Sequence, residues 1–236
     1  MDFGLLGFGV DGWGDEMLRG AFMTLMVSIA AYSLGILLGA LGTFLKLSKS
    51  FFLRLLADIY TTIVRGIPEL LIIYLVFFGG GIMLAKISAL LYGGQGYINL
   101  PVFVTGMICI GFSSGAYSAE VIRGAVLAVP KGQIEAAKAI GMTPFTLFKR
   151  VLGPQVARLA LPGMGNIWQL SLNHTSMISV IGLVEIMRQS AVASGSTREP
   201  FTFYAMAGLL YLGITSISNK GFSRAEKWAA KGVRSE

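Results

Sequence analysis

Four polar side chains recur at helical spacing inside an apolar stretch of the sequence, where they could contact a polar solute. Asn166, Gln169, Asn173 and Ser176 occupy positions i, i+3, i+7 and i+10. At about 100° per residue they fall within an arc of about 80° on one helix face. Polar groups in hydrocarbon cost free energy unless they are hydrogen-bonded. The four side chains therefore form a polar stripe that either lines a substrate pathway or makes hydrogen bonds between helices at a subunit interface.

Two ionisable residues accompany this stripe. His174 is the only histidine, and it suits either a proton relay or a hydrogen-bonded packing role. Glu69 directly follows Pro68, and a proline interrupts a helix because it lacks a backbone donor. We expect Glu69 to pair with Arg65, four residues earlier, or to meet a cationic substrate. Glu69, His174 and the four stripe residues are the candidate substrate pathway.

Other conspicuous residues have structural explanations. Gly35 and Gly39 form a GxxxG pattern that Gly42 extends, and this pattern favours close packing of helices in membranes. Glu120 and Arg123 are spaced i, i+3, which predicts an ion pair on one helix surface. We expect a structural role for each group; the alternatives are a direct role of the glycine face in transport and a functional site at the Glu120–Arg123 pair.

The composition is that of a membrane protein. Hydrophobic residues make up 54% of the 236 residues and charged residues 13%, against about 25% charged in soluble domains. The net charge of +7 reflects basic residues between apolar runs rather than a nucleic-acid surface. We expect contact with membrane lipid and no nucleic-acid partner.

Five stretches are close to the roughly 20 residues that an apolar helix needs to cross a bilayer. The first is free of charge and the second has Glu69 near its start. The sequence therefore predicts an all-α integral membrane protein with about five transmembrane helices, at Gly20–Leu45, Ile67–Ala85, Tyr97–Tyr117, Leu159–Leu183 and Phe201–Ser218.

The distribution of basic residues predicts the orientation. Residues 46–66, 120–158 and 219–236 hold 15 of the 19 Lys and Arg residues. Because basic loops stay on the cytoplasmic side, we expect the N-terminus outside and the C-terminus in the cytoplasm. The predicted organisation is an external segment 1–19, a transmembrane domain 20–218 and a basic cytoplasmic tail 219–236.

One predicted cytoplasmic loop, at about 130–154, contains two short helices. Lys131–Ile140 is rich in good helix formers, and Gly141 suits a C-terminal stop. Thr143 is a plausible N-cap with Pro144 at the first helical position. This second helix should end by Gly153-Pro154 and carry one apolar face, formed by Phe145, Phe148, Val151 and Leu152. The loop is either a rigid knob that enters a partner or an amphipathic segment on the lipid.

The same loop resembles the EAA motif of ABC importer permeases. Glu135-Ala136-Ala137 is followed by three residues and then Gly141, and Val151-Leu152-Gly153-Pro154 stands where the family has Ile-x-Leu-Pro. The stretches "YTTIVRGIPELL", "GAYSAEVIRGAVLAVPKGQIEAAKAIGM", "SVIGLVEIM" and "STREPFTFY" resemble the polar amino-acid branch. Within it the chain is similar to histidine, lysine, arginine, ornithine and opine (octopine, nopaline) permeases, over roughly residues 20–218.

The resemblance implies a type I importer fold in the bacterial inner membrane. Glu135, Ala136, Ala137 and Gly141 would couple to cytoplasmic ATP-binding subunits, and a second permease, self or sibling, would complete the channel. A periplasmic solute-binding protein would deliver a polar, basic amino acid or opine to outer loops that include Glu185–Pro200. At Asn173-His174 the sequence departs from the Lys-Ser or Lys-Asp of that branch.

ATP hydrolysis is expected in the partner, not in this chain. A P-loop ends in Gly-Lys followed by Ser or Thr, and the sequence has no Gly-Lys dipeptide. We expect no catalytic residues, no metal and no cofactor here, since a single histidine cannot support a usual zinc cluster. The alternative function is a secondary transporter or channel driven by an ion gradient, for which Glu69 and His174 would be the evidence.

Overall fold

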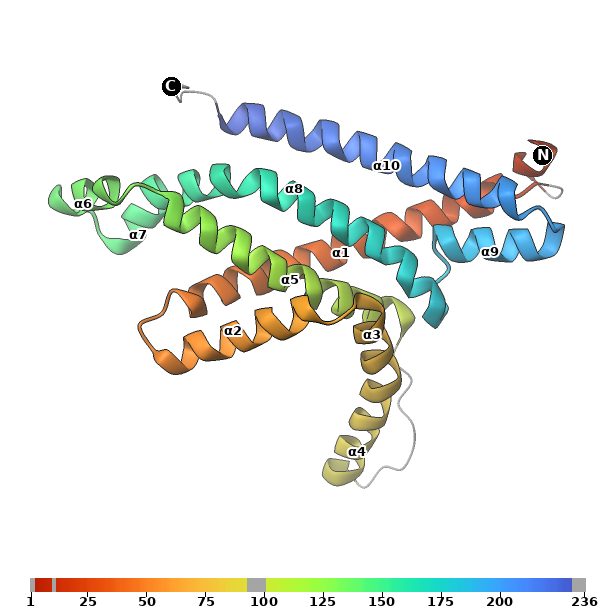
Figure 1. The fold of residues 1–236 in the computed structure, drawn as a ribbon, viewed down its shortest axis with the longest axis horizontal. Helices are drawn as coiled ribbons and strands as arrows, with labels where there is room; N and C mark the ends of the chain where they lie inside the picture. Colours follow the sequence, from red (N-terminus) through yellow and green to blue (C-terminus); the bar gives the residue numbers. More distant parts are fainter. Residues whose placement is uncertain (1–2, 10–11, 93–100, 231–236) are drawn as a thin grey trace.

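The computed structural model describes residues 3–9, 12–92 and 101–230, and every regular element in these ranges is helical. Figure 1 shows the elements as an elongated bundle. Their bounds are α1 Gly14–Lys46, α2 Phe51–Gly66, α3 Glu69–Tyr74, α4 Gly80–Tyr92, α5 Val102–Ala128, α6 Lys131–Ala139, α7 Pro144–Leu147, α8 Gly153–Ile178, α9 Ile186–Thr197 and α10 Pro200–Ala229, with short helical turns at Phe3–Leu6, Leu75–Gly79, Phe148–Leu152 and Ser179–Ile181.

The predicted number of spans agrees with the structure. Four helical segments are long and apolar enough to cross a membrane: α1, the continuous run Glu69–Leu90, α5 and α10. The segment Pro144–Ile181, which contains α8, makes a fifth candidate together with α9, and the two are bent by 48° at their junction. The chain is therefore an all-α, multi-pass membrane protein.

Several helices extend beyond the predicted spans. α1 begins at Gly14, α5 continues to Ala128, and α10 continues to Ala229, into the segment predicted as a separate tail. The predicted start of the third span at Tyr97 lies outside the described residues, and α5 begins at Val102 after Pro101. Hydropathy marks only the part of a helix that suits hydrocarbon, so it underestimates helices that project into water.

α2 was missed by the sequence analysis, which treated residues 46–66 only as a basic connection. It is amphipathic and buries Ala57, Thr61 and Val64. The hydroxyl of Tyr60 donates a 2.6 Å hydrogen bond to the carbonyl oxygen of Phe112 on α5. α2 thus lies against the α1–α5 pair rather than forming a free loop (Figure 1).

The centre of the fold is the close contact between α1 and α5. A Cβ atom built on Gly39 would lie 2.4 Å from Cβ of Ser118, and one on Gly35 would lie 2.1 Å from Oγ of Ser114. Only glycine permits this approach. The hydroxyl of Thr43 then donates to the carbonyl oxygen of Ala119 over 2.9 Å. The packing role predicted for the glycine pattern is confirmed.

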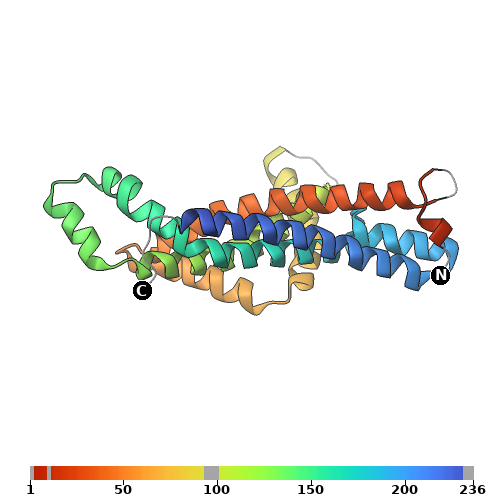
Figure 2. The same cartoon turned by 90° about the horizontal axis from the view of Figure 1, so that it is seen from above.

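The two ends of the bundle differ. Figure 2 shows α6 and α7 projecting beyond the helices at one end, whereas the described N-terminal residues and α9 lie at the other. The end of α1 and the end of α10 both point toward the α6–α7 end (Figure 1). The described parts of the segments predicted to be cytoplasmic therefore approach one end of the molecule, from which α2 runs back along the bundle (Figure 1).

Candidate functional site: an exposed helical loop and a polar pathway

The loop between α5 and α8 has the predicted glycine bend. The N–H of Gly141 donates to the carbonyl oxygen of Lys138 over 2.9 Å, and the N–H of Met142 donates to the carbonyl oxygen of Ala137 over 3.1 Å. These two bonds close a Schellman motif, which needs a left-handed residue at the bend. Gly141 supplies it with φ of +78°. The sequence thus ends α6 sharply and turns the chain toward α7.

The start of the second helix is also as predicted. Thr143 has extended backbone geometry, its side chain accepts from the N–H of Thr146, and Pro144 is the first helical residue. The predicted end at Gly153-Pro154 is wrong. A π-helical turn, Phe148–Leu152, carries the chain directly into α8. Proline is tolerated in the first turn of α8, where its missing N–H would have no helical partner.

The surface of this loop is mixed. Glu135 and Ala136 are exposed, whereas Ala137 is buried at 4% exposure. Ile140 and Phe145 are each 73% exposed. A loop with exposed large apolar side chains beside charges fits both predicted alternatives, contact with a protein partner and contact with the lipid surface.

A side-chain hydrogen bond fixes the loop to the bundle. Nε2 of Gln155, near the start of α8, donates to Oε1 of Gln133 on α6 over 2.6 Å. The same Nε2 donates to the carbonyl of Val151 over 2.9 Å. Two residues that are distant in sequence therefore hold α6 against the base of α8. The bond is solvent-exposed and connects α6 to the start of α8.

The structure brings Glu69 and His174 together. Oε2 of Glu69 lies 3.5 Å from Nδ1 of His174, and Glu69 is 9% exposed. The predicted pair with Arg65 is wrong, because Arg65 instead lies over the ring of Tyr117, 5.3 Å from its centroid. The backbone turns extended at Ile67 before α3 begins, so the residues do not share the continuous helix that i, i+4 pairing requires.

The polar stripe on α8 is divided between two environments. Asn166 and Asn173 are exposed in the chain. Nε2 of Gln169 donates to Oδ1 of Asn219 on α10 over 2.9 Å, and the hydroxyl of Ser176 donates to the carbonyl of Asn173 over 2.7 Å. Gln169 thus makes a hydrogen bond between two helices of this chain, and the alternative of hydrogen bonds at a subunit interface stays a prediction. The two asparagines are left to face a pathway or a partner.

Glu185 is a buried polar residue that the sequence analysis did not select. Its side chain is fully buried and caps α9 by accepting from the N–H groups of Met187 over 3.0 Å and Arg188 over 2.8 Å. Tyr211 on α10 donates its hydroxyl to the same carboxylate over 2.9 Å. The sequence contained one signal for this role, because an acidic residue directly before a helix often acts as its N-cap. The predicted outer loop Glu185–Pro200 is mostly the helix α9, which this cap stabilises.

A second ionic cluster joins three helices near the loop. Arg123 contacts Glu120 with 3.1 Å between Nε and Oε2, which confirms the predicted pair. Lys46 at the end of α1 also contacts Glu120, and its Nζ lies 2.9 Å from Oδ1 of Asp58 on α2. Within the described ranges no group of three or more His, Cys, Asp or Glu residues could hold a metal ion. The cluster is a structural connection between α1, α2 and α5.

Comparison with known proteins assigns this architecture to a family. Residues 31–219 match the family described as "Binding-protein-dependent transport system inner membrane component". The chain is 59% identical to the nopaline transport system permease protein NocQ of Agrobacterium fabrum over 236 residues, 100% of both chains. It is 39% identical to the histidine/lysine/arginine/ornithine transport system permease protein HisQ of Escherichia coli over 223 residues, 94% of this chain and 97% of that protein.

Solved structures show the same fold. A chain of the crystal structure of an amino acid ABC transporter with histidines superposes with a TM-score of 0.77 and 29% identity, covering 91% of this chain and 94% of that one. A chain of the inward-facing MetNI methionine ABC transporter gives a TM-score of 0.73 at 16% identity, over 92% and 97% of the two chains. Because the family match covers most of the sequence, the chain belongs to the inner membrane components of binding-protein-dependent transport systems, the permease subunits of ABC importers.

Proposed function

We propose that this permease subunit carries a basic amino acid or an opine across the bacterial inner membrane, with the loop between α5 and α8 docked on a cytoplasmic ATPase. Membership of the family implies ATPase subunits, a partner permease and a binding protein. The two relatives named above are permeases of a nopaline transport system and of a histidine/lysine/arginine/ornithine transport system. These substrates share a cationic side chain or a derivative of one, which motivates the proposed class.

The observation that carries the coupling role is the exposed surface of α6. Glu135 and Ala136 are accessible, while the neighbouring Ala137 is buried and anchors the helix. The bend at Gly141 and the bond from Gln155 to Gln133 hold this surface in one orientation. A rigid projection of this kind fits a cleft on a partner and would transmit the partner's motion to α8.

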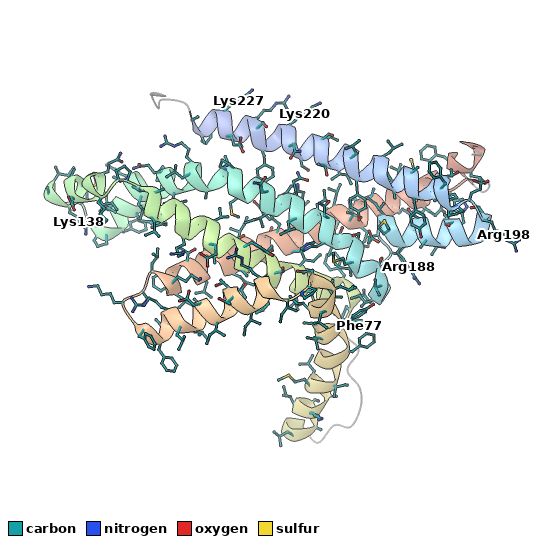
Figure 3. The ribbon with its side chains drawn as sticks, viewed as in Figure 1. Phe77, Lys138, Arg188, Arg198, Lys220 and Lys227 are labelled. Atoms are coloured by element: carbon teal, nitrogen blue, oxygen red, sulfur yellow. The ribbon has the colours of Figure 1, made fainter. Side chains whose placement is uncertain are left out.

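The arrangement of basic residues supports the proposed orientation. Figure 3 places Lys138 at the α6 end of the molecule, and the C-terminal part of α10 with Lys220 and Lys227 points toward the same end. Arg188 and Arg198 lie at the other end (Figure 3). Because most basic residues belong to the three segments that approach the α6 end, the positive-inside rule favours that end as cytoplasmic.

The proposed substrate pathway runs from the buried carboxylate of Glu69 to the exposed asparagines of α8. Glu69 is an acidic group in a membrane span, and such groups mark transport pathways or internal pairs. Its contact with His174, together with the exposed Asn173 beside it, places acidic and amide groups at one level. A cationic substrate would be attracted to Glu69, and the amides of Asn166 and Asn173 would hydrogen-bond to its polar groups.

The decisive experiment is uptake by a reconstituted complex. The chain is purified with its ATPase, partner permease and binding protein, placed in liposomes, and supplied with labelled arginine or nopaline. ATP-dependent accumulation that requires the binding protein supports the proposal. Uptake driven by a proton or sodium gradient without ATP would support the secondary transporter instead and refute the ATPase-coupled mechanism.

A further inference from the structure

A groove lies between α8 and α10 on the surface of the described chain. One cavity of about 380 Å³ has apolar walls that include Ile29, Phe222 and Trp168. A second cavity of about 700 Å³ continues toward the start of α8. Leu161 and Ala225 line both cavities, so the two form a single groove, here called the α8–α10 groove.

The wider part of the α8–α10 groove has an unpaired cationic side chain. Arg158 lines this cavity and is half-buried. Among the described residues its guanidinium has no ion-pair or hydrogen-bond partner. A partly desolvated charge without a partner costs free energy, and the planar guanidinium suits bidentate contact with a phosphate. The groove therefore offers an anion site at this end.

The dimensions of the groove correspond to one leaflet of a bilayer. Arg158 and Trp168 are ten positions apart on α8, which is about 15 Å along a helix. Half of a hydrocarbon core of about 30 Å is the same length. Trp228 lines the Arg158 end and is 74% exposed, as is typical of tryptophan at headgroup level. The apolar part then lies at the depth of acyl chains.

We propose that the α8–α10 groove binds one anionic phospholipid, with an acyl chain along its apolar part and the phosphate at Arg158. The orientation in the proposed function makes this a lipid of the cytoplasmic leaflet. A lipid fits better than a second copy of this chain, because a two-fold contact through this groove would bring the unpaired guanidinium of each Arg158 to the same interface. An anionic headgroup brings the complementary charge.

The proposal is tested by measuring bound lipid rather than transport. The complete complex with its ATPase and partner permease is exchanged into micelles that contain equal amounts of phosphatidylglycerol and phosphatidylcholine. The retained lipids are then counted by native mass spectrometry. Wild-type protein should retain phosphatidylglycerol in preference. Both headgroups carry a phosphate, but phosphatidylcholine also carries a cationic choline that the Arg158 guanidinium would repel. Arg158→Gln should therefore lower the phosphatidylglycerol-to-phosphatidylcholine ratio about tenfold, since the preference for a net negative headgroup is lost.

A matched control is Lys220→Gln, which removes the same charge from the side of α10 that points away from α8 (Figure 3). It should leave the lipid ratio unchanged. A second variant, Leu161→Trp, fills the junction of the two cavities and should reduce retention of both lipids. Because the readout is bound lipid, it is independent of whether the complex transports a basic amino acid.

Two outcomes would overturn the proposal. Equal phosphatidylglycerol-to-phosphatidylcholine ratios for Arg158→Gln and Lys220→Gln would show that the charge of Arg158 acts only through the general surface potential of the protein. Efficient cross-linking of two permease chains through Ala225→Cys would show that protein, not lipid, covers the α8–α10 groove.

Discussion

The carboxylate of Glu69, on α3, lies 3.5 Å from Nδ1 of His174, on α8. The two residues are separated by more than a hundred positions, and one follows a proline that breaks a helix. Their contact joins the second and fourth spans at the level of the proposed substrate pathway. An acidic group in this position either holds the helices together or exchanges its partner for a cationic substrate.

Removing the charge of Glu69 should distinguish these roles. With Glu69→Gln we expect transport of a basic amino acid to fall at least about tenfold, the equivalent of one charge-assisted hydrogen bond. Initial uptake rates in proteoliposomes measure this effect. Glu226→Gln, a carboxylate on the extension of α10, serves as the control. Unchanged uptake in Glu69→Gln, with normal complex assembly, would remove Glu69 from the pathway.

The buried carboxylate of Glu185 should depend on Tyr211. Tyr211→Phe keeps the ring but removes the hydroxyl that donates to Glu185, so we expect a loss of about 1–3 kcal/mol for a buried group left with fewer partners. The measurement is thermal unfolding of the purified complex. Tyr204→Phe is the matched control, since Tyr204 is 44% exposed. Equal stability of the two variants would contradict the importance of this contact.

The ionic cluster at Lys46 should depend on the positive charge of that residue. Lys46→Met leaves Glu120 without one of its two cationic partners and should destabilise the protein by about 1–2 kcal/mol, because Glu120 is partly exposed and keeps its contact with Arg123. Lys46→Arg keeps the charge and should lose less. Thermal unfolding of the purified complex measures both variants, with Lys49→Met at an exposed position as the reference. Equal losses for Lys46→Met and Lys49→Met would contradict a stabilising role of the cluster.

The α1–α5 contact should tolerate no side chain at Gly39. Its Cβ would meet Cβ of Ser118 at 2.4 Å, so Gly39→Ala must separate the helices and should reduce stability by about 1–3 kcal/mol. Gly124→Ala, where the new Cβ meets no atom within 4 Å, should be neutral or slightly stabilising. Membrane abundance and thermal unfolding of the two variants give the comparison. Equal effects would contradict the close contact between Gly39 and Ser118.

The sequence was sufficient for features that depend on local chemistry or composition. Hydropathy predicted the spans, and the pattern Gly141, Thr143, Pro144 predicted a stop, a cap and a start that the structure confirms. The EAA resemblance led to the correct family. These signals are local, because a cap or bend is determined within a few residues.

Long-range partners could not be predicted in the same way. Lys46, Asp58 and Glu120 come from three helices, and Glu185 finds Tyr211 across a helix junction. The pairing of Glu69 with Arg65 followed from sequence distance and was wrong, because the turn at Ile67-Pro68 redirects the carboxylate toward α8. Residue spacing predicts neighbours within one helix, but contacts between helices depend on how the helices pack.

The central claim is that the exposed surface of α6 contacts a cytoplasmic ATPase. The most direct measurement is cross-linking through Glu135→Cys in the assembled complex, since the native Cys109 is buried. We predict a cross-link to the ATPase subunit, and protection of the new thiol from a membrane-impermeant reagent added to the outside of intact cells. Labelling of that thiol from the outside, or cross-links only to proteins that do not hydrolyse ATP, would contradict the account.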